Sequence, residues 1–540
     1  MIGQNSKELH LLTICDLRNA RQSFVPSICT YKTFDQWINK LDLNIDIYIR
    51  DTLLMDLLNV HGEFPKFVYP IKTYESLKPD QILLSDQGLS DVYSLYVRIE
   101  AMIKKSRWEN TIKAEDFPSL ALHKVISQLG SRQNAEVLLL ELRGSLDVFL
   151  NDIFGNEVFQ NIESTLNGIN DLLQAQKEHQ FVISLINLSF SDLKDDLRRS
   201  SDVEDTALFF ELYTHQTGQF GGIPYNFLVL DYYFSQSNGD LPMLKKIAEL
   251  SQSLGLICLS SVSPVFIGIK DFQLSIEAES ISDVFSSLKL LKYRNFITEA
   301  SARYISLSLP RYCSRAAYKD ELGFFSEQIG LLGCLSNSAY LMAKTIVVNA
   351  IVNGICTEPS GSNVQVSVNN EVLRPENLET TFSSSIESVL VKLGLNPICS
   401  LAAKRTCYFH SFNSLQWGKF SLNMAKYKVA EVMETNLIYM LIVLSFTQQV
   451  KVVCREQIGL SKGVTEVTSN INHWLSQHVT NITQPSMELL KSRPLKFAEI
   501  SEVETLGDGF YAFSITIEPH FTKIKETSAI AVSMQIQRTA

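Results

Sequence analysis

The sequence lacks an excess of positive charge, a long apolar run and a secretory leader, and each absence excludes a class of protein. Lys and Arg number 48 against 58 Asp and Glu, a formal charge of −10, whereas a general nucleic-acid binder needs a basic face. The longest unbroken apolar run covers residues 437–444, and a membrane-spanning helix needs about 20 such residues. Lys7, Glu8 and Asp16 interrupt the N-terminal stretch, so we expect no secretory signal.

Cysteines are few and scattered, and none of them forms a C-x-x-C pair. Their positions are 15, 29, 258, 313, 334, 356, 399, 407 and 454. An odd, unclustered set is typical of reduced core thiols in a cytoplasmic protein rather than of a disulfide framework. We therefore expect a cytoplasmic protein.

Length and composition indicate a folded, multidomain chain. At roughly 100–200 residues per domain, 540 residues suggest two or three domains. Apolar residues make up 45% and charged residues 20%, which are ordinary globular values and exclude general disorder. The pattern divides the chain into a variable, partly helical segment (1–115), an α/β domain (116–427) and a C-terminal α+β domain (428–540).

The clearest local pattern predicts a βαβ unit. Residues 225–234 form a near-continuous apolar strand, residues 241–254 place their apolar side chains on one helical face, and residues 256–262 form a second buried strand. Gly255 ends the helix. Short links between these elements predict a right-handed parallel crossover, so the fold class is mixed α/β and α+β. A further helix with one wide buried face, which includes Val137 and Leu140, is expected over residues 135–154. A helix over residues 337–353 is expected to end in a left-handed cap at Gly354, and another is expected to begin with a capping box at Ser384.

The C-terminal region changes character. Residues 428–458 predict one long helix and residues 464–478 another, and the apolar side chains at 511, 513, 515 and 517 alternate as in a half-buried strand. The same alternation returns at the end of the sequence, at Ile530, Val532, Met534 and Ile536. A chain end frays unless something holds it, so we expect this last strand to pair with a sheet.

One catalytic motif is present, but its context is wrong. Residues 459–463 match the G-x-S-x-G pattern, in which Ser461 would be the nucleophile of a serine hydrolase. That mechanism needs a strand before the serine and a helix after it, whereas here a predicted helix precedes the motif. We expect Gly459 to cap that helix and keep a hydrolase only as an alternative.

Other candidate sites are equally weak. Gly218, Gly221 and Gly222 precede a strand, whereas a phosphate-binding loop follows one. His473 and His478 are five residues apart and lie on different helix faces, unlike a metal-binding pair. The acidic residues at 202, 204 and 205 fit a solvated helix start. We expect no enzyme activity, no metal and no cofactor.

Several longer blocks carry a family resemblance. Residues 206–235, 240–268 and 302–312 contain an F-G-G-x-P turn, an apolar strand with an Asp-Tyr pair, an L-x-x-I-A helix, a small-residue strand ending in S-P, and an R-Y-I-x-L-x-L-P-R segment. Weaker matches continue at 140–146, 336–343, 393–399, 452–459, 473–479, 493–495 and 518–521. In this order, the blocks resemble the large sheath subunit of the bacterial type VI secretion system.

The resemblance covers about residues 130–540 and has two departures. Leu230 stands where the family usually has Gly, and Leu142 where it usually has Trp. The residues that match the family motif, which the resemblance marks as structural positions, are Gly221, Gly222, Pro224, Asp231, Pro310, Arg311, Arg493, Pro494 and Pro519.

The resemblance implies a mechanical function. In that family a large and a small subunit form a heterodimer, and heterodimers stack into a helical sheath that surrounds a tube of stacked hexamers. The sheath is anchored at the envelope through a baseplate, contracts to propel the tube, and is dismantled by an AAA+ unfoldase.

Exchanged β-strands link neighbouring heterodimers in the family, which suggests that residues 530–536 pair with a neighbour. Two alternatives remain open at this point. One is that the last strand closes the sheet of its own chain instead of pairing with a neighbour. The other is that the protein is the sheath of a phage-tail-like injection device instead of a type VI sheath subunit.

Overall fold

The fold is built around one large, twisted sheet. The computed structural model describes residues 9–537 apart from 18–23, 61–64, 106–107, 220, 238, 273–277, 288–289, 329–331, 422–426, 460–463, 507–509 and 523–526. The sheet has eight strands in the order β14-β13-β8-β7-β6-β1-β5-β2. Six of them are parallel: β1 (Leu9–Cys15), β5 (Phe181–Asn187), β6 (Phe227–Phe234), β7 (Ile257–Val262), β8 (Ile305–Leu309) and β13 (Leu395–Leu401). The edge strands β2 (Ser27–Cys29) and β14 (Thr406–Phe409) are antiparallel.

Helices cover both faces of the sheet, because its strands are apolar on both sides. Leu11 packs into a core with α7 (Glu157–Glu178) and α13 (Ser338–Asn353), whereas the next residue, Leu12, packs with α10 (Asp240–Leu254) on the other face. The predicted βαβ unit is confirmed: β6 and β7 are parallel neighbours joined by α10, and Gly255 ends the helix with φ 71°. This mixed α/β architecture confirms the predicted fold class.

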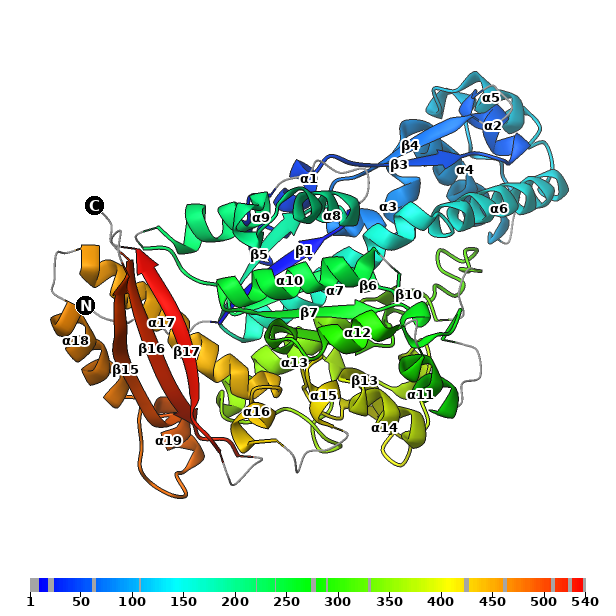
Figure 1. The fold of residues 1–540 in the computed structure, drawn as a ribbon. Coiled ribbons are helices and arrows are strands. Elements are labelled where there is room, and N and C mark those ends of the chain that lie inside the picture. The colour runs from blue at the N-terminus through cyan, green and yellow to red at the C-terminus, as the bar shows by residue number, and fades with distance from the viewer. Residues whose placement is uncertain are drawn as a thin grey trace.

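The segment 1–115 contributes directly to this sheet. Its strand β1 pairs with β5 on one side and with β6 on the other. The same segment supplies β3 (Leu43–Tyr48), β4 (Lys66–Ile71), α2 (Thr52–Leu58) and α4 (Gln87–Ile103) to a lobe that projects from the sheet (Figure 1). The lobe also contains α5 (Leu120–Ser127) and α6 (Arg132–Phe154), which follow the segment in the chain. The division of the chain at residues 115 and 427 stays a prediction.

Three local predictions need correction. The helix expected over 428–458 is two helices, α16 (Val429–Met433) and α17 (Leu437–Gly459), because the Asn436 side chain accepts hydrogen bonds from the first amides of α17. Ser383 caps α14 (Ser384–Lys392) in place of the expected Ser384. Gly354 follows α13 with φ 92° and ψ 150°, which is not the left-handed helical cap predicted there.

Several further helices and strands are short. They are α1 (Phe34–Lys40), α3 (Pro79–Leu83), α8 (Phe190–Arg199), α9 (Ala207–Phe209), β9 (Tyr312–Arg315), β10 (Cys334–Ser336), α11 (Ala278–Ser286), α12 (Leu291–Phe296), β11 (Ser367–Val368), β12 (Glu371–Val372), α15 (Trp417–Phe420) and α19 (Met487–Ser492).

Candidate assembly interface

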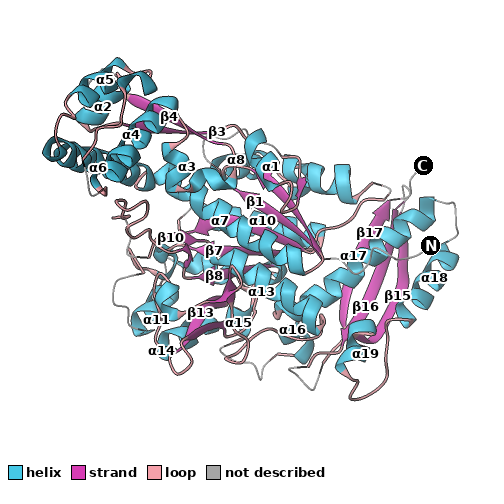
Figure 2. Cartoon of the chain, turned by 180° about the vertical axis from the view of Figure 1, so that it is seen from behind, coloured by secondary structure: helices cyan, strands magenta, loops and turns pink. Residues whose placement is uncertain are grey.

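The C-terminal residues form a separate three-stranded antiparallel sheet. Its strands are β15 (Leu495–Leu506), β16 (Phe510–Pro519) and β17 (Ile530–Gln537), in that order. Alternation along β16 buries Phe513, Ile515 and Ile517 in the core that also contains α17 and α18 (Val464–Ser476). Figures 1 and 2 show this sheet and the lobe at opposite ends of the molecule.

The last strand pairs with the sheet of its own chain. β17 runs antiparallel to β16, with Ile530 opposite Ile517 and Gln537 opposite Phe510. Ile530 is buried and Val532 packs partly against the same core, as their alternation predicts. Met534 and Ile536 follow on β17, but their side chains lie outside the described part of the structure.

The two edges of this sheet differ. The outer edge of β15 is covered at Ile500, where the Asn472 side chain accepts from the backbone N–H at 2.8 Å and donates to the backbone oxygen at 3.0 Å. Leu495 on the same strand pairs with residues 478–480. No described strand pairs with the outer edge of β17, so its outward amide and carbonyl groups form a template for another strand.

The base of β17 is tied to its own chain. Tyr439 on α17 donates its hydroxyl hydrogen to the backbone oxygen of Ser528 at 2.6 Å, and Thr527 donates to the Glu518 carboxylate at 2.7 Å. Sequence reasoning missed these anchors, since Tyr439 lies within an apolar helix and carries no local signal of its partner. The anchors fix where the strand starts.

Helix α17 joins the C-terminal sheet to the large sheet. The Gln448 amide donates to the backbone oxygens of Tyr225 at 2.8 Å and Gly255 at 2.7 Å, just before β6 and β7. Among the described helices, one segment of α17, Leu437–Cys454, is long and apolar enough to cross a membrane, but 78% of it is buried inside the protein. Such burial is typical of a core helix.

Three motif positions meet at the base of the C-terminal sheet. Pro494 precedes Leu495, which lies opposite Pro519 at the end of β16, and the Pro494 backbone oxygen accepts from His520 N–H at 2.8 Å. Arg493 ends α19 and is exposed. These residues shape the start of the β15–β16 pair.

Asp231 and Arg311 act as structural anchors around the carboxyl ends of β6 and β8. The buried Asp231 carboxylate accepts from the hydroxyls of Thr165 at 2.5 Å and Tyr340 at 3.0 Å, which fixes α7 and α13 on β6. Burial raises the pKa of Asp231. Arg311 follows Pro310 and donates through Nε to the buried Glu379 at 3.0 Å.

The glycine turn lies at the opposite, amino end of β6. Gly221 has φ 78°, and a Cβ at Gly222 would lie 1.9 Å from the backbone oxygen of Gln216. Only glycine fits this close approach. Pro224 follows, half-buried, just before the strand. The structure therefore does not bring the motif positions together into one site.

The discounted chemical motifs gain no support. Ser461 lies outside the described residues, and the element that precedes it is the helix α17 rather than a strand. The His478 ring contacts Trp474 and Phe446, and Asp202, Glu204 and Asp205 are exposed. No three His, Cys, Asp or Glu residues within the described ranges gather as metal ligands.

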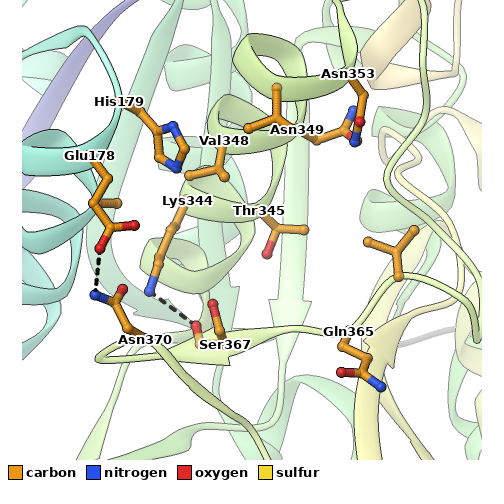
Figure 3. A pocket seen from close by; sticks show the side chains of 13 residues that line it. Glu178, His179, Lys344, Thr345, Val348, Asn349, Asn353, Gln365, Ser367 and Asn370 are labelled. Carbon is orange, nitrogen blue, oxygen red and sulfur yellow. Dashed lines mark hydrogen bonds between the residues drawn. The ribbon is translucent and has the colours of Figure 1, made fainter.

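A pocket of about 230 Å³ lies between the end of α7, α13 and β11 (Figure 3). The Lys344 ammonium, which lines it, donates to buried Asp171 at 2.7 Å and to the backbone oxygen of Ser367 at 3.2 Å. Glu178 accepts from Asn370 at the rim. The strongest charges of the pocket are therefore used within the fold.

Comparison with known proteins gives matches over most of the chain. Residues 136–416 match the model of the EvpB/VC_A0108 tail sheath N-terminal domain, and residues 426–536 match the tail sheath gpW/gp25-like domain of the same family. The type VI secretion system sheath protein TssC1 of Pseudomonas aeruginosa is 25% identical over 434 residues, which cover 75% of this chain and 85% of that protein.

Solved structures give weaker similarities. A chain of the anti-feeding prophage baseplate is 11% identical to this chain, with a TM-score of 0.34. The match covers 69% of this chain and 77% of the baseplate chain. The sheath tail protein Lin1278 of Listeria innocua is 9% identical with a TM-score of 0.33, and the match covers 58% of this chain and 57% of Lin1278.

The two family models span both the large sheet and the C-terminal sheet. The chain therefore belongs to the EvpB/VC_A0108 tail sheath family, the large sheath subunits of type VI secretion systems.

Proposed function

We propose that this contractile-sheath subunit is linked to neighbouring subunits by strand pairing along the open edge of β17. The observation that carries the proposal is the difference between the edges of the C-terminal sheet. The outer edge of β15 is paired at Leu495 and at Ile500, whereas β17 has no described strand on its outer side. An exposed edge strand commonly accepts an extended segment of another chain. The residues assigned to the link are Ile530, Val532, Met534 and Ile536.

The strength of such a link suits a contracting assembly. Pairing about six residues adds roughly six main-chain hydrogen bonds, each contributing about 0.5–1.5 kcal/mol net. Surface ion pairs contribute about 0–1 kcal/mol each and can break and re-form as subunits slide. A head-to-tail contact that does not close on itself produces an open helix, which is the geometry of a sheath.

The partners follow from the family. The chain is proposed to form a heterodimer with a small sheath subunit, to contact neighbouring heterodimers, and to surround a tube of stacked hexamers. A baseplate is proposed to hold the sheath at the envelope, and an AAA+ unfoldase to dismantle it after contraction. The role is structural, without catalysis.

Co-expression with the small sheath subunit tests this function. We expect hollow tubules in electron micrographs of the co-expressed pair and none from the chain alone, because the heterodimer is the assembling unit. Tubules from the chain alone would instead indicate a single-subunit, phage-tail-like sheath. Stable heterodimers that never form tubules would contradict the strand-linked assembly.

A further inference from the structure

Polar contacts at the base of β17 connect all three strands of the C-terminal sheet. Lys496 on β15 donates to the hydroxyl oxygen of Thr527, and Thr527, just before β17, donates to Glu518 on β16 at 2.7 Å. The Lys496 ammonium also lies 3.6 Å from the Glu518 carboxylate. Tyr439 on α17 adds the hydrogen bond to the Ser528 backbone oxygen at 2.6 Å. All of these contacts lie outside the β16–β17 ladder itself.

The contacts combine a fixed group with groups that water reaches. The Tyr439 side chain is buried, and its ring packs edge-to-face against Phe521 with 5.8 Å between the ring centres. Lys496, Glu518 and Thr527 are half-buried. Polar contacts at the edge of a core open more readily than the core itself, so this group can open while the rest of the chain stays folded.

These contacts restrict how far β17 can move from its own sheet. Ser528 lies two residues before Ile530, and two extended residues span at most about 7 Å. The preceding described anchor is Thr522, whose backbone N–H and hydroxyl both donate to the Cys356 backbone oxygen at 3.2 Å. Thr522 lies eight residues before Ile530, a span of at most about 29 Å. Opening the contacts around Ser528 therefore lets β17 reach beyond its own sheet.

The strand ladder does not distinguish β17 of this chain from β17 of an identical neighbour. Both strands present the same residues to β16 along the whole ladder. A neighbour's strand also brings the same Thr527 and Ser528 groups to the base. The base contacts therefore leave the energy of an exchanged state unchanged, but they must break before a strand can leave. They control the rate of exchange and not its end point.

We propose that these contacts form a latch, defined as Tyr439, Lys496, Glu518, Thr527 and the Ser528 backbone oxygen, that keeps β17 on its own chain until subunits assemble. The latch slows the exchange of β17 between free subunits and so limits strand-linked association outside the sheath. The inference rests on the proposed function, because it concerns the strand assigned to the link between subunits.

Mixed disulfides between two differently tagged chains measure the exchange of β17. One full-length chain carries Ser514→Cys on β16 and the other carries Ser533→Cys on β17, and these positions lie opposite each other in the ladder. Opposed residues of antiparallel strands have Cα atoms about 4.5–5.5 Å apart, which a disulfide can bridge. All nine native cysteines are buried, so the introduced thiols are the ones expected to react under a mild oxidant. A disulfide between the two chains reports that β17 of one chain lies on β16 of the other.

Loss of the latch is expected to speed this reaction. With Tyr439→Phe/Thr527→Val in both chains, the mixed disulfide should form about tenfold faster, equivalent to about 1.4 kcal/mol, with little change in its final amount. Thr527→Ser alone retains the hydroxyl and should keep the wild-type rate. Tyr232→Phe is the matched control and should also keep that rate, because it removes a tyrosine hydrogen bond to the Leu188 backbone oxygen at 2.8 Å outside the C-terminal sheet.

The outcomes separate the latch from the proposed function. Equal rates for the latch variant and the wild type, or no mixed disulfide in either, overturn the latch, and wild-type tubules in co-expression then leave strand linkage intact. A Tyr232→Phe chain that exchanges as fast as the latch variant also overturns it, because general loosening then explains the effect. Faster exchange in the latch variant of a chain that never forms tubules supports the latch and contradicts the sheath function.

Discussion

Deletion of residues 528–540 is expected to abolish sheath tubules while leaving a folded chain that binds the small subunit. The deletion removes β17, whose outer edge has no described partner within the chain. It leaves the β15–β16 pair, which is held by α17 and by the Asn472 contacts to Ile500. Loss of buried Ile530 alone costs about 1.5–3 kcal/mol. The deletion also removes the pairing of β17 with β16 and the Ser528 oxygen that accepts from Tyr439, so a lower melting temperature is expected.

A shorter deletion is the matched control. Removing residues 538–540 leaves β17 complete, and tubules are expected in normal number and length. Negative-stain electron microscopy counts tubules, and copurification measures heterodimer formation. Abundant tubules from the longer deletion would show that β17 only closes the sheet of its own chain.

Substitution of Arg315 by methionine is expected to lower the free energy of unfolding strongly. Arg315 donates to Glu163 at 2.6 Å and to Glu327 at 2.9 Å, and both carboxylates are buried. Its guanidinium also lies 4.2 Å from the centre of the Tyr318 ring. Removing one partner of a buried ion pair leaves an uncompensated charge and destabilises by about 3–5 kcal/mol, which denaturant unfolding measures.

The same substitution should make stability depend on pH. Burial raises the pKa of Glu163 and Glu327 adds to the shift, while Arg315 opposes both. Without Arg315 the folded-state pKa rises further above the unfolded value of about 4.3, so folding favours the protonated acid. The stability contributed by the protonated form is complete at low pH and is lost as pH rises through the folded pKa. The variant should therefore be less destabilised at pH 5 than at pH 8.

Removing the two acids as well is the control. Adding Glu163→Gln and Glu327→Gln to Arg315→Met is expected to recover most of the stability and to abolish the difference between pH 5 and pH 8, because no buried charge remains. Equal destabilisation of the single variant at both pH values would contradict a role for the buried carboxylates.

The sequence predicted those parts of the fold whose signals are local. The β6–α10–β7 unit could be predicted because two continuous apolar runs flank an amphipathic helix that ends at Gly255. Strand β1 was missed, since His10 and Thr13 interrupt a short apolar run and its partners β5 and β6 lie far along the chain. Parallel pairing over such a separation leaves no periodic trace near either strand.

The candidate interface was predictable only in part. Alternation at Ile530 and Val532 identified the strand, but the covering of β15 by Asn472 depends on a contact between two elements and has no sequence pattern. Val137 and Leu140 on α6 are exposed, so their assignment to a buried face was wrong. Their spacing shows that they share a side of the helix, but it does not show whether another element covers that side. Apolar periodicity therefore predicts which residues share a face more reliably than it predicts whether that face is buried.

Hydrogen–deuterium exchange of β17 in free heterodimers and in tubules tests strand linkage most directly. In an edge strand about half of the backbone amides point away from the paired neighbour and exchange readily. Pairing with a neighbouring subunit should slow exchange over residues 530–537 by about tenfold or more in tubules, while the already paired central strand β16 changes little. Equal exchange of β17 in heterodimers and tubules would contradict strand linkage between subunits.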